Sequence, residues 1–154
     1  MAVKTGVVFT SNLKDVIKMV TKVSEDRMKE ATNHYRNALI DAVKTGTRSG
    51  ISYPVPSRSR TRLASGRAAP RKNPRRYTAS APGEIPAVAS GQLVKSIRSM
   101  VKKGYDLYGV VGSTVQHAVH LEYGTFKMKP RPFFWPVYKK NRAAIQAILS
   151  RRWF

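Results

Sequence analysis

Three side chains that could bind a metal lie close together in the chain: His117, His120 and Glu122. Two histidines three residues apart on a helix share a face, and with a carboxylate they could contribute to a zinc site. A zinc site also needs suitable ligand geometry and hydrogen bonds that orient its ligands, and this spacing matches no standard motif. Glu122 stands among cationic residues, so we interpret it as an ion-pair partner of Arg131. We therefore expect no metal and no other cofactor.

The sequence supports nucleophilic or acid–base catalysis no better than it supports a metal site. The chain has neither the Gly-x-Ser-x-Gly nor the His-Glu-x-x-His pattern, and it contains no cysteine. Most of its acids lie along the first predicted helix, as on a solvated face, and are not arranged as paired catalytic carboxylates. The serines Ser96, Ser99 and Ser113 are interpreted as ordinary polar positions. The sequence therefore predicts a protein that is not an enzyme.

Positive charge dominates the chain, with 29 Lys and Arg against 8 Asp and Glu and a formal net charge of +21. No acid occurs between Ala42 and Gly83, and a basic run of this kind repels itself until an anionic surface meets it. Nucleic acid is one candidate partner. Sparse aromatics and the lack of a nucleic-acid-binding signature favour an acidic protein surface, with non-specific DNA contact allowed. The predicted interface residues of this basic arm are Arg58, Arg60, Arg62, Arg67, Arg71, Lys72, Arg75 and Arg76.

Large aromatic residues mark a second candidate interface. Trp153 and Phe154 are hard to enclose in one small domain, so we expect them to anchor a neighbouring subunit. No membrane partner is expected, because the chain lacks a run of about 18 apolar residues. The first residues also lack the apolar stretch of a secretory signal.

Apolar spacing predicts the elements of the first third of the chain. Val3 to Phe9 has the composition of a short strand, and Ser11 or Asn12 could cap a following helix. From Leu13 to Val43 the apolar residues recur every three or four positions, which predicts one long helix, and a slip of phase near Ser24 leaves room for a bend there. Such a helix is longer than a compact domain of this size can cover. We therefore expect part of its apolar stripe to face another subunit.

The middle of the chain, about 47 to 89, is predicted to be an extended arm because its prolines exclude a long helix or a central strand. Order resumes with a short helix from Ser90 to Ile97. Two antiparallel strands, a further helical turn before Gly124 and a final helix opened by Pro132 follow. The fold class is thus α+β in a single domain, residues 1 to 154. A long N-terminal helix and a C-terminal helix pack on a small, mostly antiparallel sheet.

Two segments carry an unusual pattern of Gly, Pro and apolar residues. The first reads Ser-Ala-Pro-Gly-Glu-Ile-Pro-Ala-Val from Ser80 and continues into Ser-Gly-Gln-Leu. The second contains Leu-Glu-Tyr-Gly-Thr from Leu121, followed by Arg-Pro-Phe. Together they resemble, in the same order, the tailed-bacteriophage neck family of head–tail joining and tail-completion proteins, similar to the lambda minor tail protein Z. The matching positions are Pro82, Gly83, Glu84, Pro86, Gly91, Leu93, Leu121, Glu122, Gly124, Thr125, Arg131, Pro132 and Phe133.

This resemblance implies a structural virion protein that forms a ring and joins the DNA-filled head to the tail. It implies a homo-oligomer of six or twelve copies, assembled in the bacterial host cytoplasm. Its partners would be other neck proteins, namely a portal-side adaptor or stopper and a tail terminator or tail tube. The sequence departs from the family where Ala89-Ser90 replaces a frequent Asp-Thr pair and where the Arg-rich insertion is long. A basic nucleic-acid-binding protein is the alternative.

Overall fold

The computed structural model describes residues 12–55 and 76–152, and within these ranges the fold is α+β. The first element is the helix α1, Leu13–Lys44, with 32 residues and a length of about 48 Å. It agrees with the predicted helix and runs without a break through Ser24. Asn12 precedes it, but no side-chain hydrogen bond from Asn12 caps the helix. The strand predicted over Val3 to Phe9 lies outside the described residues.

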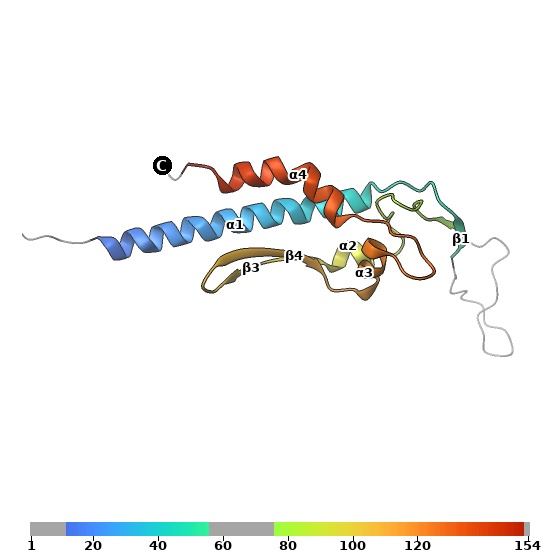
Figure 1. Ribbon diagram of the computed structural model, residues 1–154, viewed down its shortest axis with the longest axis horizontal. Helices are drawn as coiled ribbons and strands as arrows, with labels where there is room; N and C mark the ends of the chain where they lie inside the picture. Colours follow the sequence, from blue (N-terminus) through green and yellow to red (C-terminus); the bar gives the residue numbers. More distant parts are fainter. Residues whose placement is uncertain (1–11, 56–75, 153–154) are drawn as a thin grey trace, which may run out of the picture.

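Two antiparallel pairs of strands follow as separate sheets. The short strands β1, Ser52–Pro54, and β2, Arg76–Thr78, pair with each other at one end of the molecule (Figure 1). The longer strands β3, Ile97–Lys103, and β4, Leu107–Ser113, form a hairpin in which Ile97 pairs with Ser113. The hairpin was predicted from Gly and Asp in its turn, and the pairing confirms it.

Three further helices complete the described fold. The short helix α2, Gln92–Ser96, precedes β3, and α3, Gln116–Tyr123, follows β4. The last helix, α4, Phe134–Leu149, has Pro136 in its first turn, where a missing N–H costs no helical hydrogen bond. None of the helices in the described ranges is long and apolar enough to span a membrane.

The long helix α1 forms the middle layer, with the β3–β4 hairpin along one side and α4 along the other (Figure 1). On the hairpin side, Ser99 donates a hydrogen bond to the Asn33 side chain at 2.8 Å, and Lys103 pairs with Glu25 at 2.6 Å. On the other side, Arg151 pairs with Glu30 at 3.2 Å. These polar contacts link α1 to the hairpin on one side and to the segment after α4 on the other.

The core lies at the C-terminal end of α1 and not along its whole length. There the end of α1 meets α2, the start of β3, α3 and the start of α4, and the side chains of Leu39, Ile97 and Phe133 are fully buried. The remaining members of this buried cluster are Val43, Leu93, Ala118 and Val137. The segments that carry both sequence motifs therefore surround the only large buried cluster found in the described residues.

Candidate functional site

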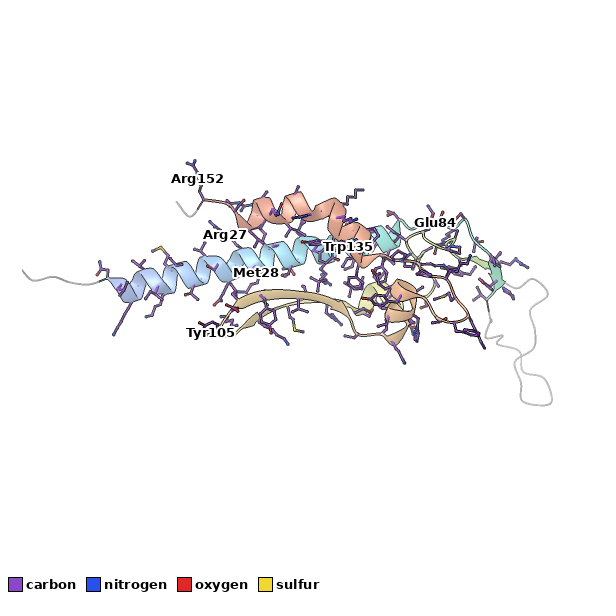
Figure 2. The ribbon with its side chains drawn as sticks, in the orientation of Figure 1. Arg27, Met28, Glu84, Tyr105, Trp135 and Arg152 are labelled. Carbon is purple, nitrogen blue, oxygen red and sulfur yellow. The ribbon has the colours of Figure 1, made fainter. Side chains whose placement is uncertain are left out.

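The first motif forms a tight turn held by its own carboxylate. Gly83 has φ +83°, a conformation that favours glycine, and it lets the chain reverse before Glu84. The Glu84 carboxylate accepts hydrogen bonds from the Ser49 hydroxyl, from the Thr47 hydroxyl at 2.7 Å and from the Ala81 N–H at 2.9 Å. These donors, Ser49 first, lower the pKa of Glu84 below its ordinary value. The ionised Glu84 carboxylate thus links the turn to the segment after α1 by hydrogen bonds, and we call this contact the Glu84 clasp (Figure 2).

The rest of the first motif packs against the body. Pro86 is buried, and the Tyr77 hydroxyl donates to the Ala87 carbonyl at 2.7 Å. Gly91, with φ +77°, starts α2 and turns the side chain of Leu93 into the core. The arm predicted over about 47 to 89 is therefore too long at its C-terminal end. Residues 79 and 80 are buried, so the chain from there on belongs to the packed body. The reason is that the Glu84 clasp and the Tyr77 contact hold it there.

The second motif ends α3 and begins α4. Gly124 ends α3 with φ +78°, and its N–H donates to the His120 carbonyl at 2.9 Å. One oxygen of Glu122 accepts the N–H groups of Phe133 at 2.8 Å and Phe134 at 3.1 Å. Its other oxygen lies 3.4 Å from the N–H of Trp135. Glu122 therefore caps the N-terminus of α4 from a different helix.

The predicted ion pair between Glu122 and Arg131 is wrong. No salt bridge joins them in the described structure, and Glu122 instead binds the free N–H groups at the start of α4, where the helix dipole also favours a negative charge. The backbone N–H of Arg131 donates to the Leu121 carbonyl at 2.7 Å. The Arg131 Nε atom is buried, with no hydrogen-bond partner among the described residues.

The two motifs, far apart in the sequence, meet in space. The N–H of Gly83 in the first motif donates to the carbonyl of Pro130 in the second at 2.9 Å. A cleft of about 220 Å³ lies between them; its walls are mostly apolar, and His117 and Arg131 also line it. Its walls include Val43, Tyr77, Pro86, Val88, Leu93 and Leu121. The arrangement is a structural joint that sets the directions of α1, α2 and α4 relative to one another.

The histidine cluster does not assemble into a metal centre in the residues that the structure describes. His117 and His120 are exposed, and the carboxylate of Glu122 points to the α4 backbone. Over the described ranges, no group of three or more His, Asp or Glu side chains is placed to hold a metal ion.

The basic arm is described only at its two ends. Its residues from Arg58 to Arg75 lie outside the described ranges, and so do Trp153 and Phe154. Arg76 lies within β2, where its guanidinium donates to the Ser52 hydroxyl at 3.2 Å and to the Ser52 carbonyl at 3.1 Å. Arg76 therefore fastens the base of the arm to β1, a role that the charge pattern did not predict.

Two polar residues, the half-buried Tyr35 and the buried Arg27, were missed by the sequence analysis. The Tyr35 hydroxyl donates to the Phe134 carbonyl at 2.8 Å, and burial, followed by the nearby Glu122 and Tyr138, raises the pKa of Tyr35 to about 12. Arg27 is buried and donates to the Arg152 carbonyl at 2.7 Å (Figure 2). Its position between Val23 and Ala31 on one helix face was the available signal, because a cation on an apolar stripe needs a buried partner.

Comparison of the chain with protein-family models, curated proteins and solved structures gives no match.

Proposed function

We propose that this protein is a structural component of a bacteriophage neck, which forms a ring and joins the DNA-filled head to the tail. The convergence of the two motif segments into one joint carries the proposal. These segments underlie the resemblance to neck proteins. Their two acids, Glu84 and Glu122, act as clasps for backbone and hydroxyl groups, a use of carboxylates that suits an architectural role better than a catalytic one.

The shape of the described fold is consistent with a subunit that bridges neighbours. The joint and core occupy one part of the molecule, and α1 extends far beyond them (Figure 1). The β1–β2 pair, from which the basic arm leaves, lies at the end opposite the start of α1. In this proposal the joint fixes the geometry of the ring, while the arm contacts an acidic surface of the protein above or below.

The proposed assembly is a ring of six or twelve copies, in the virion and built in the bacterial host cytoplasm. One face would meet a portal-side adaptor or stopper, and the other a tail terminator or tail tube. The net charge of +21 also suits non-specific contact with DNA passing through the channel.

The test is genetic and structural. A phage whose gene for this protein carries an early stop codon should accumulate DNA-filled heads and separate tails, and a plasmid copy should restore joined virions. Electron microscopy of lysates measures both outcomes. Normal joined particles without the protein would contradict the proposal.

The same net charge supports a second candidate, a basic nucleic-acid-binding protein. A monomer that binds DNA tightly, and loses affinity on the order of a thousandfold between 50 and 200 mM salt, would favour this function over the neck role. Fluorescence anisotropy with a labelled duplex, combined with mass measurement of the bound species, separates the two candidates.

A further inference from the structure

The cleft between the two motifs has room for one group of side-chain size. Its volume of about 220 Å³ is below the roughly 300–1,000 Å³ of clefts that enclose drug-sized ligands. Its apolar walls come from the end of α1, the loop before α2, α2 itself and α3, which meet at one end of the molecule (Figure 1). An apolar group in the cleft is therefore enclosed by several elements that the joint holds in place.

Arg131 lines this cleft and carries a positive charge without a partner among the described residues. Its Nε atom is buried and makes no hydrogen bond there, and none of the salt bridges of the described ranges includes its guanidinium. A buried donor without an acceptor costs free energy, and a guanidinium stays protonated in proteins. Arg131 therefore favours an anionic group in the cleft.

The acidic side chains of this chain do not neutralise Arg131. Glu84 accepts hydrogen bonds from two hydroxyls and a backbone N–H, and Glu122 caps α4 through the N–H groups of Phe133 and Phe134. The residues outside the described ranges contain no Asp or Glu at all. A carboxylate for Arg131 must therefore come from another molecule.

Two further polar groups lie at the cleft and favour the same kind of ligand. Ser80 lines the cleft and is 2 % exposed, and its hydroxyl makes no hydrogen bond to another described residue. Arg48 contacts two residues of the wall: its guanidinium lies 5.9 Å from the centre of the Tyr77 ring and donates to the Val88 carbonyl at 3.4 Å. The cleft thus combines apolar walls with a hydroxyl donor and two nearby cations.

The charge of the protein favours another protein as the source of the carboxylate. A net charge of +21 attracts surfaces that are rich in Asp and Glu. Pockets of side-chain size hold the anchor residues of partner proteins, where a buried apolar contact and a desolvated charge pair combine. A nucleic acid suits the cleft less well, because its phosphate groups have no apolar body to contact the walls.

We propose that this cleft binds an acidic segment of another protein. An apolar side chain of that segment fills the cleft, and a carboxylate next to it pairs with Arg131 and accepts a hydrogen bond from Ser80. This inference goes beyond the proposed function, because the cleft would bind such a segment whether or not the protein forms a ring.

Short capped peptides test the proposal on the full-length protein. The probes are the tetrapeptides Gly-Phe-Glu-Gly and Gly-Glu-Phe-Gly, and the controls carry Gln in place of Glu. Isothermal titration calorimetry measures their affinities. At least one Glu peptide should bind, and about tenfold more tightly than its Gln form, because only the carboxylate makes a charge-assisted pair with Arg131. This comparison needs no change to the protein.

Variants of the cleft locate the binding site. Arg131→Gln should remove the preference for Glu, so that the Glu and Gln peptides bind alike. Ser80→Ala, which removes only the hydroxyl, should reduce the same preference. Arg142→Gln is the matched control, because Arg142 is an exposed arginine of α4 that does not line the cleft, and it should keep the preference. An unchanged circular dichroism spectrum shows that each variant is folded.

The possible results separate the site from its occupant. Failure of both Glu peptides to bind would overturn the site, and equal affinity for the Glu and Gln forms would overturn the pairing with Arg131. Tighter binding of hydrocinnamate than of either Glu peptide would replace the protein segment by a free acid. Dissociation of wild-type oligomers by saturating peptide, seen by light scattering, would make a second copy the occupant. None of these results depends on the joining of heads and tails, which the stop-codon phage tests separately.

Discussion

Glu122 lies in α3 and caps the N-terminus of α4, so it links the two helices. Glu122→Ala leaves the N–H groups of Phe133 and Phe134 without their acceptor. We expect the free energy of unfolding to fall by about 1–2 kcal/mol, the usual cost of losing a helix cap. Glu122→Gln keeps an acceptor oxygen and should cost less. Urea unfolding measures both, with the exposed Asp41→Ala as the control for loss of an acid. Equal stability of all three variants would exclude the capping role.

Gly124 has a backbone conformation that other residues avoid. At φ +78° a side chain is strained, and a Cβ atom would lie 2.8 Å from the Met128 carbonyl oxygen. Gly124→Val should therefore destabilise the fold by more than about 1 kcal/mol. The matched control is Gly104→Ala, where φ is not positive and the nearest atom is 4.0 Å away. If thermal unfolding shows the same loss for both variants, the strain at Gly124 is not the cause.

The raised pKa of Tyr35 predicts how the free energy of unfolding changes at alkaline pH. Its pKa is raised from 10.0 to about 12, so between these values the folded state holds a proton that the unfolded state has lost. The contribution of Tyr35 to the free energy of unfolding is therefore complete below pH 10 and is lost as pH rises toward 12. Tyr35→Phe should make the fall of stability with pH less steep across this window. Tyr105→Phe, at a fully exposed tyrosine, should leave the slope unchanged. Urea unfolding at several pH values measures the slopes, and identical slopes would contradict the prediction.

At the scale of elements, the hairpin lies against α1 because Gly109 has no side chain. A Cβ atom there would overlap the Thr32 methyl group, which a β-branched residue in a helix cannot easily move. Gly109→Ala should therefore separate β4 from α1 and cost about 1–3 kcal/mol. Gly112→Ala is the control in the same strand, because a Cβ atom there meets open space. Denaturant unfolding compares the two, and a neutral Gly109→Ala would show that the layers are not closely packed.

At the scale of the whole molecule, the core and the basic arm are expected to have separate roles. Pro54 pairs with Arg76 across β1 and β2, so a short Gly/Ser turn could replace residues 56–75 without moving either strand. The shortened protein should stay soluble with nearly the same melting temperature, because the buried cluster is intact. Phage that carry it should accumulate unjoined heads and tails. A large fall in melting temperature would instead assign the arm to the core.

The sequence by itself determined the local elements of this protein. Apolar residues at three-and-four spacing predicted α1, Gly and Asp predicted the β3–β4 turn, and Gly124 marked the end of α3. The final helix was also predicted, but it begins at Phe134 and not at Pro132. These signals succeed because they act between residues close in the chain, where backbone geometry and hydrogen bonding leave few choices.

Only the tertiary structure decided which groups meet. Sequence spacing suggested Arg131 as the partner of Glu122, but folding brings the backbone N–H groups at and just before the start of α4 to its carboxylate. In the same way, the contact between Gly83 and Pro130 and the exposure of the apolar residues at the start of α1 depend on where the layers end. A carboxylate binds the donors within about 3 Å of it, and an apolar face is buried only where another element reaches it. Both conditions are distances in space, which chain order does not contain.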